Sequence, residues 1–251
     1  MVRRAATAAK LSLDTLRNMR AGLQYAHRLP AESPGPGLDG QANNPLEAYF
    51  DSVTEGPGIW KWRHYFAIYH RHLQRFVGKA PRVLEIGIYS GGSLPMWLHY
   101  FGDGTQVYGV DIEPACTAHE REGVRVFIGD QADPEFWERF VSEVPRVDVV
   151  IDDGGHEAHQ QIASLRSLLP HLAPGGVYVC EDVTGAFHQF HSFVDGLTRP
   201  LSTVYSEPTA LHGQVGSVHH YPALTVIEKP DRPVERFEAV KHGTVWEPGI
   251  Y

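Results

Sequence analysis

The sequence is poor in the features that mark several large classes of protein. It holds only two cysteines in 251 residues, Cys116 and Cys180, which are too few for a disulfide framework. Neither has neighbours at zinc-ligand spacing, and Cys180 ends an apolar run where a buried thiol is expected. No apolar run approaches the roughly 20 residues that a membrane-spanning helix needs. These absences exclude a disulfide scaffold and predict no membrane partner.

An excess of basic residues is missing as well. The chain has 22 basic and 30 acidic residues and a net charge of −8, whereas a general nucleic-acid binder needs a basic face for the phosphates. The basic start of the chain (Arg3, Arg4 and Lys10) lacks the continuous apolar stretch of a targeting peptide. We therefore expect no nucleic-acid partner, an ordinary N-terminal helix and a cytoplasmic location. The length suffices for one large α/β domain.

The first 80 residues have helical rather than strand-like patterns. Apolar residues at helical spacing predict a helix from about Ala5 to Leu29. The segment Pro30–Asn44 is rich in Pro, Gly and Asn, which predicts a loop or a lid. A short helix can open at Pro45–Phe50, and an aromatic-rich helix is predicted over Trp60–Phe76, ended by Gly78.

From Pro81 onward, apolar runs alternate with helical patterns. Nearly continuous apolar runs are typical of strands buried on both faces, and the alternation predicts a mostly parallel sheet between helices. The predicted strands are Arg82–Ile86, Gln106–Val110, Val124–Ile128, Val147–Ile151 and Gly176–Cys180, and the helices lie near Ser93–Phe101, Pro134–Val144 and Ala158–Leu172. Two further runs, Leu201–Tyr205 and Leu224–Glu228, have no full helix between them and predict an antiparallel pair at the sheet edge.

The predicted fold class is therefore α/β: a Rossmann-like, seven-stranded, mostly parallel sheet with an antiparallel last strand, helices on both faces and an N-terminal helical segment. We divide the chain into an N-terminal helix and loop or lid (1–44), a helical cap region (45–80), a nucleoside-binding core (81–229) and a C-terminal tail (230–251).

A glycine-containing loop follows the first core strand and precedes a helix. Such loops let the backbone approach a ligand at the carboxyl end of a sheet. The spacing Glu85-x-Gly87-x-x-x-Gly91 differs from the Gly-x-Gly-x-x-Gly of dinucleotide sites and resembles motif I of class I S-adenosylmethionine (SAM)-dependent methyltransferases. Asp111 ends the second strand, where a carboxylate can accept ribose hydroxyls, and Asp130 ends the third, at the expected adenine position. The predicted SAM-binding residues from these motifs are Glu85, Gly87, Tyr89, Ser90, Gly91, Ser93, Asp111, Asp130, Gln131 and Asp152. A generic glycine turn, with Asp111 as a helix cap, is the alternative.

Carboxylates also cluster after the fourth and fifth strands, at Asp153, Glu181 and Asp182. If these strands are neighbours, the three side chains converge, and keeping them ionised requires a cation. Oxygen ligands suit Mg²⁺ or another hard divalent cation, which can orient an acceptor hydroxyl and lower its pKa. His156, three residues after Asp153, is the predicted base, so Asp153 and His156 are the predicted catalytic residues. The alternative is that Asp152 and Asp153 cap a helix and the other carboxylates are loop residues.

Together these segments resemble the macrolide-type sugar O-methyltransferases, which include macrocin, mycinamicin and rhamnosyl enzymes, and the cephalosporin hydroxylase-like proteins. The matching segments are Val83–Leu94, Tyr108–Ile112, Ile128–Gln131, Ile151–His156 and Pro174–Asp182. The resemblance implies SAM, a divalent metal (usually Mg²⁺) on Asp153, Glu181 and Asp182, His156 as the base, a glycosylated natural product as substrate and a homo-oligomer. It also places Lys61 and Tyr65 in a segment that covers the cofactor. Because the chain is short, it resembles the rhamnosyl branch most, and we expect a rhamnosyl-type acceptor.

The chain departs from that family at Val183–Ala186 and at His219–Ala223, so these segments leave the acceptor's identity open. Three other functions compete: a hydroxylase-type enzyme, a non-catalytic SAM-binding partner subunit and an NAD-dependent dehydrogenase. The first is disfavoured because no iron site of two histidines and one carboxylate is evident at a plausible spacing. The carboxylate trio and His156 disfavour the second, and the glycine spacing disfavours the third.

Overall fold

The computed structural model of the chain describes residues 2–30, 44–185, 188–202 and 207–243. The chain divides into two units, Met1–Gly40 and Gln41–Tyr251. The first contains helix α1 (Val2–Ala26), so a helix forms here as predicted, but it begins and ends before the predicted bounds of Ala5 and Leu29. The predicted lid, Pro30–Asn44, falls almost wholly outside the described residues. No helix in the described part of the chain has the length and apolar character needed to cross a membrane.

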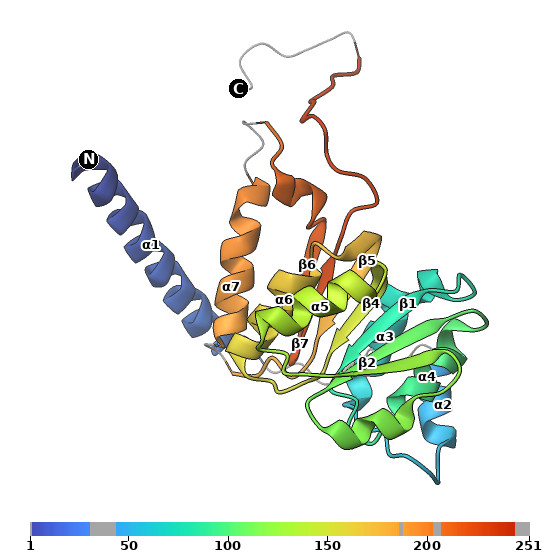
Figure 1. The fold of residues 1–251 in the computed structure, drawn as a ribbon. Coiled ribbons are helices and arrows are strands. Elements are labelled where there is room, and N and C mark those ends of the chain that lie inside the picture. The colour runs from blue at the N-terminus through green and yellow to red at the C-terminus, as the bar shows by residue number, and fades with distance from the viewer. Residues whose placement is uncertain (1, 31–43, 186–187, 203–206, 244–251) are drawn as a thin grey trace. The chain divides into compact units, whose positions relative to one another are not determined.

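The second unit is built on a seven-stranded sheet (Figure 1). Its strands are β1 (Arg82–Ile86), β2 (Gln106–Asp111), β3 (Val124–Ile128), β4 (Val147–Asp152), β5 (Leu172–Cys180), β6 (Ser217–Tyr221) and β7 (Leu224–Glu228). Their spatial order is β3-β2-β1-β4-β5-β7-β6. Strands β1 to β5 pair in parallel, while β7 runs antiparallel to β5 and β6 antiparallel to β7. The predicted Rossmann-like fold, including the pairing of the fourth and fifth strands, is confirmed.

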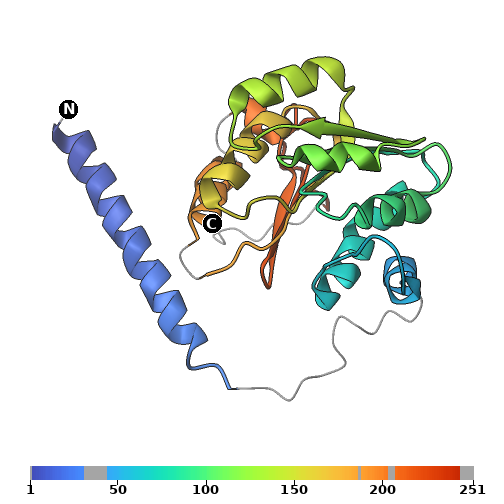
Figure 2. The same cartoon turned by 60° about the horizontal axis from the view of Figure 1, so that its bottom comes forward.

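Helices cover both faces of the sheet, as Figures 1 and 2 show. One layer holds α2 (Pro45–Ser52), α3 (Arg63–Leu73) and α4 (Ser93–Phe101), and the other holds α5 (Pro134–Glu143), α6 (Ala158–Leu168) and α7 (Gln189–Thr198). Successive strand residues point to opposite faces, so Val83 packs in the core under α3 and α4, while Leu84 packs in the core under α5 and α6. Both cores are almost free of solvent, which explains why the central strands read as continuous apolar runs.

The edge of the sheet differs from the prediction. Leu201 and Ser202 belong to a 3₁₀ turn, Arg199–Ser202, which follows α7, and residues 203–206 lie outside the described part of the chain. The strand that pairs with β7 is instead Ser217–Tyr221. Its polar and histidine-rich sequence hides its strand character, and its turn, Pro222-Ala223, lacks the Asn-Gly or Asp-Gly pair that signals a tight hairpin. The antiparallel edge pair was thus predicted, but one of its strands was misplaced.

Two helices also differ from their predicted extent. α3 begins only at Arg63, so Trp60 to Trp62 precede it without helical structure. α6 ends at Leu168 and β5 already begins at Leu172. Helix α7 has no counterpart among the predicted elements, because its four apolar residues are interspersed with histidine, glycine and polar residues.

Candidate active site

A cavity of about 630 Å³ lies at the carboxyl ends of the parallel strands. Its walls come from the loops after β1, β2, β3, β4 and β5 and from the segment 58–62 that precedes α3. Strands β1 and β4 are neighbours in the sheet. After β1 the chain continues to β2 on one side of this pair, and after β4 it continues to β5 on the other side. Open α/β sheets bind ligands at such switch points, so the topology itself favours this cavity as the functional site.

The glycine loop closes tightly against the neighbouring loop. Gly87 has a φ of +81°, and a Cβ placed there would collide with the backbone oxygen of Asp153. Gly91 has a φ of +73°, and a Cβ there would meet the ring of His119. Both positions therefore require glycine for two reasons, backbone conformation and close approach.

Asp111 holds this loop in place. Its Oδ2 accepts hydrogen bonds from the backbone N–H groups of Ile88 and Tyr89, each at 3.0 Å, and its Oδ1 accepts one from Glu113 at 2.9 Å. The Cys116 thiol, a weak donor, also hydrogen-bonds to Asp111, and a ligand hydroxyl can replace this thiol because Asp111 lines the cavity. The same carboxylate can therefore order the glycine loop and still accept a hydroxyl of a ligand.

The end of β3 and the end of β4 are joined by a buried hydrogen-bond network. Gln131 donates from Nε2 to Oδ1 of Asp152 and to Oγ of Ser164, both at 3.0 Å, and accepts from the backbone of Gly155 at 2.6 Å. Tyr178 donates to the other oxygen of Asp152 at 2.6 Å. Burial raises the pKa of Asp152 to about 6, against the opposing effect of these donors. Asp152 thus lies behind the cavity wall and fixes Gln131.

Lys61 is the centre of a buried cluster of opposite charges. Its side chain is only 2% exposed, and its Nζ lies 2.6 Å from Oδ2 of Asp153, 3.0 Å from Oε1 of Glu181 and 3.5 Å from Oε1 of Glu85. Burial alone would lower the pKa of Lys61, but the three carboxylates outweigh burial and raise it well above its ordinary value. Burial raises the pKa of Glu181 in spite of the opposing ammonium group. Lys61 is therefore a fixed positive charge at the floor of the cavity.

Aromatic side chains from α3 and from the segment before it donate hydrogen bonds to the carboxylates of Glu181 and Asp182. Tyr69 donates to Oε1 of Glu181 at 2.6 Å, while Tyr65 and the indole N–H of Trp62 donate to Oδ1 of Asp182 at 2.8 and 2.9 Å. Tyr65 and Tyr69 are four residues apart and so share one face of the helix. These contacts explain why α3 must pack next to the β5 loop.

Asp153, His156 and Asp182 converge at the cavity wall. One potential ligand atom from each lies within 4.8 Å of the others. Nε2 of His156 is 3.9 Å from Asp153 and 3.7 Å from Asp182, and its side chain is 42% exposed, so it can be reached from the cavity. Among the described residues, three of the five non-glycine residues with positive φ line this cavity, namely Tyr89, His156 and Asp182. Backbone strain of this kind gathers at functional sites.

Most of the residues singled out from the sequence line the cavity. These are Lys61, Gly87, Tyr89, Ser93, Asp111, Asp130, Gln131, Asp153, His156, Glu181 and Asp182. The remaining ones stand behind or beside its lining: Glu85, Ser90, Gly91, Asp152 and Tyr65. Glu85 is buried, accepts from Ser93 at 2.6 Å and faces Lys61.

Sequence reasoning did not select Tyr69, Trp62 or Gln161 for the site. Gln161 donates to the backbone oxygen of Glu181 at 2.9 Å. The helical spacing of Tyr65 and Tyr69 was the one available signal, because it puts both hydroxyls on the same face. Nothing local pairs Trp62 with Asp182 or Gln161 with Glu181, since these partners are far apart in the chain.

Comparison with known proteins agrees with this geometry. Residues 84–183, which contain the glycine loop and the strand ends up to Asp182, match the family model described as a methyltransferase domain. The fold and the site thus define a methyltransferase domain of the α/β class.

The relatives with which the chain aligns are O-methyltransferases. The chain is 32% identical over 230 residues to an 8-demethyl-8-α-L-rhamnosyl tetracenomycin-C 2'-O-methyltransferase of Streptomyces olivaceus, covering 80% of this chain and 58% of the relative. It is 39% identical over 136 residues to the demethylmacrocin O-methyltransferase of Streptomyces fradiae, covering 51% and 34%. The mycinamicin VI 2''-O-methyltransferase of Micromonospora griseorubida is 40% identical over 126 residues, covering 47% and 31%.

A solved structure agrees as well. The MycE methyltransferase of the mycinamycin biosynthetic pathway, in complex with Mg, SAH and mycinamycin VI, superposes with a TM-score of 0.64 at 28% identity and covers 81% of this chain and 56% of that one. In sequence and in fold, the chain is thus similar to these sugar O-methyltransferases. It spans between about a third and three fifths of the length of the relatives named here.

Proposed function

We propose that the protein is a SAM-dependent O-methyltransferase that methylates a sugar hydroxyl of a glycosylated natural product, with a rhamnosyl-type sugar as the expected acceptor. The observation that carries this proposal is a cavity in which a glycine loop, ordered by Asp111, faces a carboxylate cluster at the ends of β4 and β5. The tetracenomycin relative, which is named for a rhamnosyl substrate, supports the choice of sugar.

The residues present fit SAM. Asp111 can exchange its weak bond with the Cys116 thiol for a ligand hydroxyl, and the close approach at Gly87 leaves the backbone, rather than a side chain, at the cavity wall. Asp130 lines the cavity, and its Oδ1 accepts from Ala132, while its Oδ2 has no hydrogen bond from the part of the chain that the structure describes. We assign Gly87, Tyr89, Asp111 and Asp130 to cofactor contact. When bound, SAM supplies the electrophilic methyl group.

The residues also fit a divalent cation. Glu85, Asp153, Glu181 and Asp182 bring four carboxylates together, and Lys61 provides one buried positive charge against them. Asp153 and Asp182 are the two whose side chains are partly exposed, and their oxygen donors suit Mg²⁺. We propose that Asp153, Glu181 and Asp182 hold Mg²⁺, for which Asp153 and Glu181 must each exchange part of their contact with Lys61. Such a cation lowers the pKa of an acceptor hydroxyl.

In this proposal the protein's own groups position the acceptor and move its proton. His156 takes the proton from the sugar hydroxyl at Nε2, and the adjacent carboxylates of Asp153 and Asp182 stabilise the imidazolium that results. Lys61, Tyr65 and Tyr69 keep the carboxylates oriented, so the acceptor oxygen is aligned before reaction.

A direct test combines the full chain with methyl-labelled SAM, Mg²⁺ and a panel of rhamnosylated polyketides and other deoxysugar glycosides. The expected result is one labelled methyl group on a sugar hydroxyl and one equivalent of S-adenosylhomocysteine. Hydroxylated products would favour the hydroxylase alternative. Calorimetric binding of SAM without turnover on any glycoside would favour a non-catalytic subunit, and tighter binding of NAD than SAM would overturn the proposal.

A further inference from the structure

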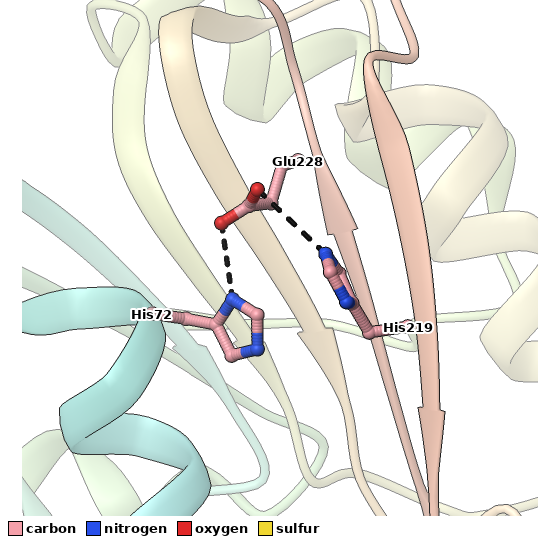
Figure 3. Close-up of side chains that lie close together, drawn as sticks. All are labelled: His72, His219 and Glu228. Carbon is pink, nitrogen blue, oxygen red and sulfur yellow. Dashed lines mark hydrogen bonds and ion pairs between the residues drawn. The ribbon is translucent and has the colours of Figure 1, made fainter.

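A second group of possible metal ligands lies outside the cavity. His72 of α3, His219 of β6 and Glu228 of β7 point toward one another (Figure 3). Nδ1 of His72 is 3.0 Å from Oε1 of Glu228, and Nε2 of His219 is 3.8 Å from Oε2. One donor atom of each lies within 4.8 Å of the other two. The spacing of these residues in the sequence gives no sign of the group, because three distant elements assemble it.

The group is separate from the proposed active site. Glu228 pairs with Val177 in β5, three residues before Cys180 at the carboxyl end of that strand. With a rise of about 3.3 Å per residue, this is a displacement of about 10 Å along the strand. None of the three residues lines the cavity.

Neighbouring polar groups orient these side chains. The hydroxyl of Tyr221 lies 2.9 Å from Nε2 of His72, so the ring is held with Nδ1 toward Glu228. Oγ of Ser217 lies 3.1 Å from both Nε2 of His219 and Oε2 of Glu228. The contact of Tyr221 with the far nitrogen of His72 is an outer hydrogen bond of the kind that fixes the ring orientation of metal-binding histidines. Ser217 instead contacts the nitrogen of His219 and the oxygen of Glu228 that face each other, so its hydroxyl must turn aside when a cation binds.

The group of His72, His219 and Glu228 is buried on the His72 side and partly open to solvent on the side of His219 and Glu228. His72 is buried, whereas the side chains of His219 and Glu228 are 39% and 24% exposed. Arg75 approaches Oε1 of Glu228 at 3.4 Å, but Oε2 faces His219 and Ser217 instead. Two imidazoles and one carboxylate, with an open side for water, form a ligand set that suits Zn²⁺ or non-haem Fe²⁺ rather than Mg²⁺.

We propose that His72, His219 and Glu228 form a binding site for Zn²⁺ or a cation of similar chemistry, which joins α3 to the edge strands β6 and β7. Since α3 carries Tyr65 and Tyr69, such a cation stabilises the helix that orients the active-site carboxylates. The site stands on its own geometry and does not depend on the proposed methyl transfer.

The test is calorimetric titration of the chelator-treated full chain with Zn²⁺ in excess Mg²⁺. Wild type is expected to bind Zn²⁺ and to gain thermal stability. His219→Gln and Glu228→Gln should each weaken Zn²⁺ binding by more than roughly 100-fold. Loss of a residue that only hydrogen-bonds to a metal ligand typically weakens metal binding by roughly 10- to 100-fold, and the loss of a ligand itself should cost more. His219 is partly exposed, so its variant is expected to fold even if Glu228→Gln does not, and circular dichroism checks this.

Two control variants make the result specific. His220→Gln changes the adjacent residue of β6, whose ring lies beside Thr225 rather than Glu228, and Asp182→Asn changes the proposed active site. Both should bind Zn²⁺ like wild type and show the same rise in melting temperature. Absence of Zn²⁺ binding to wild type, or undiminished binding to His219→Gln, would show that the group is a hydrogen-bond network without a metal.

Discussion

The two halves of the cavity are built in different ways. The cofactor half, at the ends of β1, β2 and β3, consists of backbone N–H groups and glycines organised around Asp111. The carboxylate half, at the ends of β4 and β5, consists of ionised side chains organised around Lys61. One half fixes the backbone of a glycine loop around one carboxylate, and the other concentrates negative charge around the buried ammonium group of Lys61.

This difference separates two tasks. Backbone donors and short loops change little when a ligand binds, which suits a cofactor that every reaction cycle uses. Carboxylates that lie close together repel one another, and one ammonium group neutralises them only in part. A bound divalent cation would relieve this repulsion, so this half suits the binding of a metal and an acceptor hydroxyl. We therefore expect changes in the carboxylate half to affect turnover and stability, and changes in the cofactor half to affect SAM affinity.

The largest effect is expected from His156→Gln. Loss of a general base lowers kcat by roughly 10²- to 10⁴-fold, while SAM binding stays unchanged because His156 lies in the carboxylate half. Methyl-transfer kinetics and SAM calorimetry on the same preparation measure the two quantities. His159→Gln, a change at an exposed histidine three residues further on, should leave both unchanged. Near-wild-type turnover of His156→Gln would remove the base from the mechanism.

The next effect concerns stability. Lys61→Met leaves Asp153, Glu181 and Glu85 without their buried counter-charge, and breaking a buried ion pair in this way costs about 3–5 kcal/mol. Urea denaturation gives the free energy of unfolding. The matched control is Arg63→Met, which removes an exposed pairing with Glu47 and Asp51 and should cost at most about 1 kcal/mol. Equal losses in both variants would mean that Lys61 has no special structural role.

The smallest effect is expected in the cofactor half. Asp111→Asn removes a charge-assisted acceptor, for which about 1.5–3 kcal/mol is typical. SAM affinity should therefore fall by roughly 10- to 150-fold, with little change in the rate at saturating SAM. Glu113→Gln is the control, since its carboxylate caps a 3₁₀ turn and does not line the cavity. An unchanged SAM dissociation constant for Asp111→Asn would contradict its assignment.

The same division explains what could be predicted from the sequence. Local sequence patterns predict the central strands, the glycine loop and Asp111, because each of them depends on neighbours within one strand–loop–helix unit. The parallel sheet then brings the ends of β4 and β5 together, which is why the convergence of Asp153 and Asp182 could be anticipated.

Contacts between distant segments could not be read in this way. Lys61 was selected only through a family resemblance, as a cofactor-covering residue, and its contacts with Asp153 and Glu181 depend on how α3 packs on the sheet. Strand β6 was misplaced because its pairing with β7, rather than its own composition, makes it a strand. The group of His72, His219 and Glu228 exists only once that edge pair is in place.

The central claim is that the carboxylate half needs a divalent cation for turnover while the cofactor half binds SAM without it. The most direct measurement compares methyl transfer and SAM affinity before and after removal of metal by a chelator, followed by addition of Mg²⁺ alone. We predict that SAM affinity is retained, that methyl transfer is lost on stripping and that Mg²⁺ restores it. Full methyl transfer by the stripped enzyme would contradict the account.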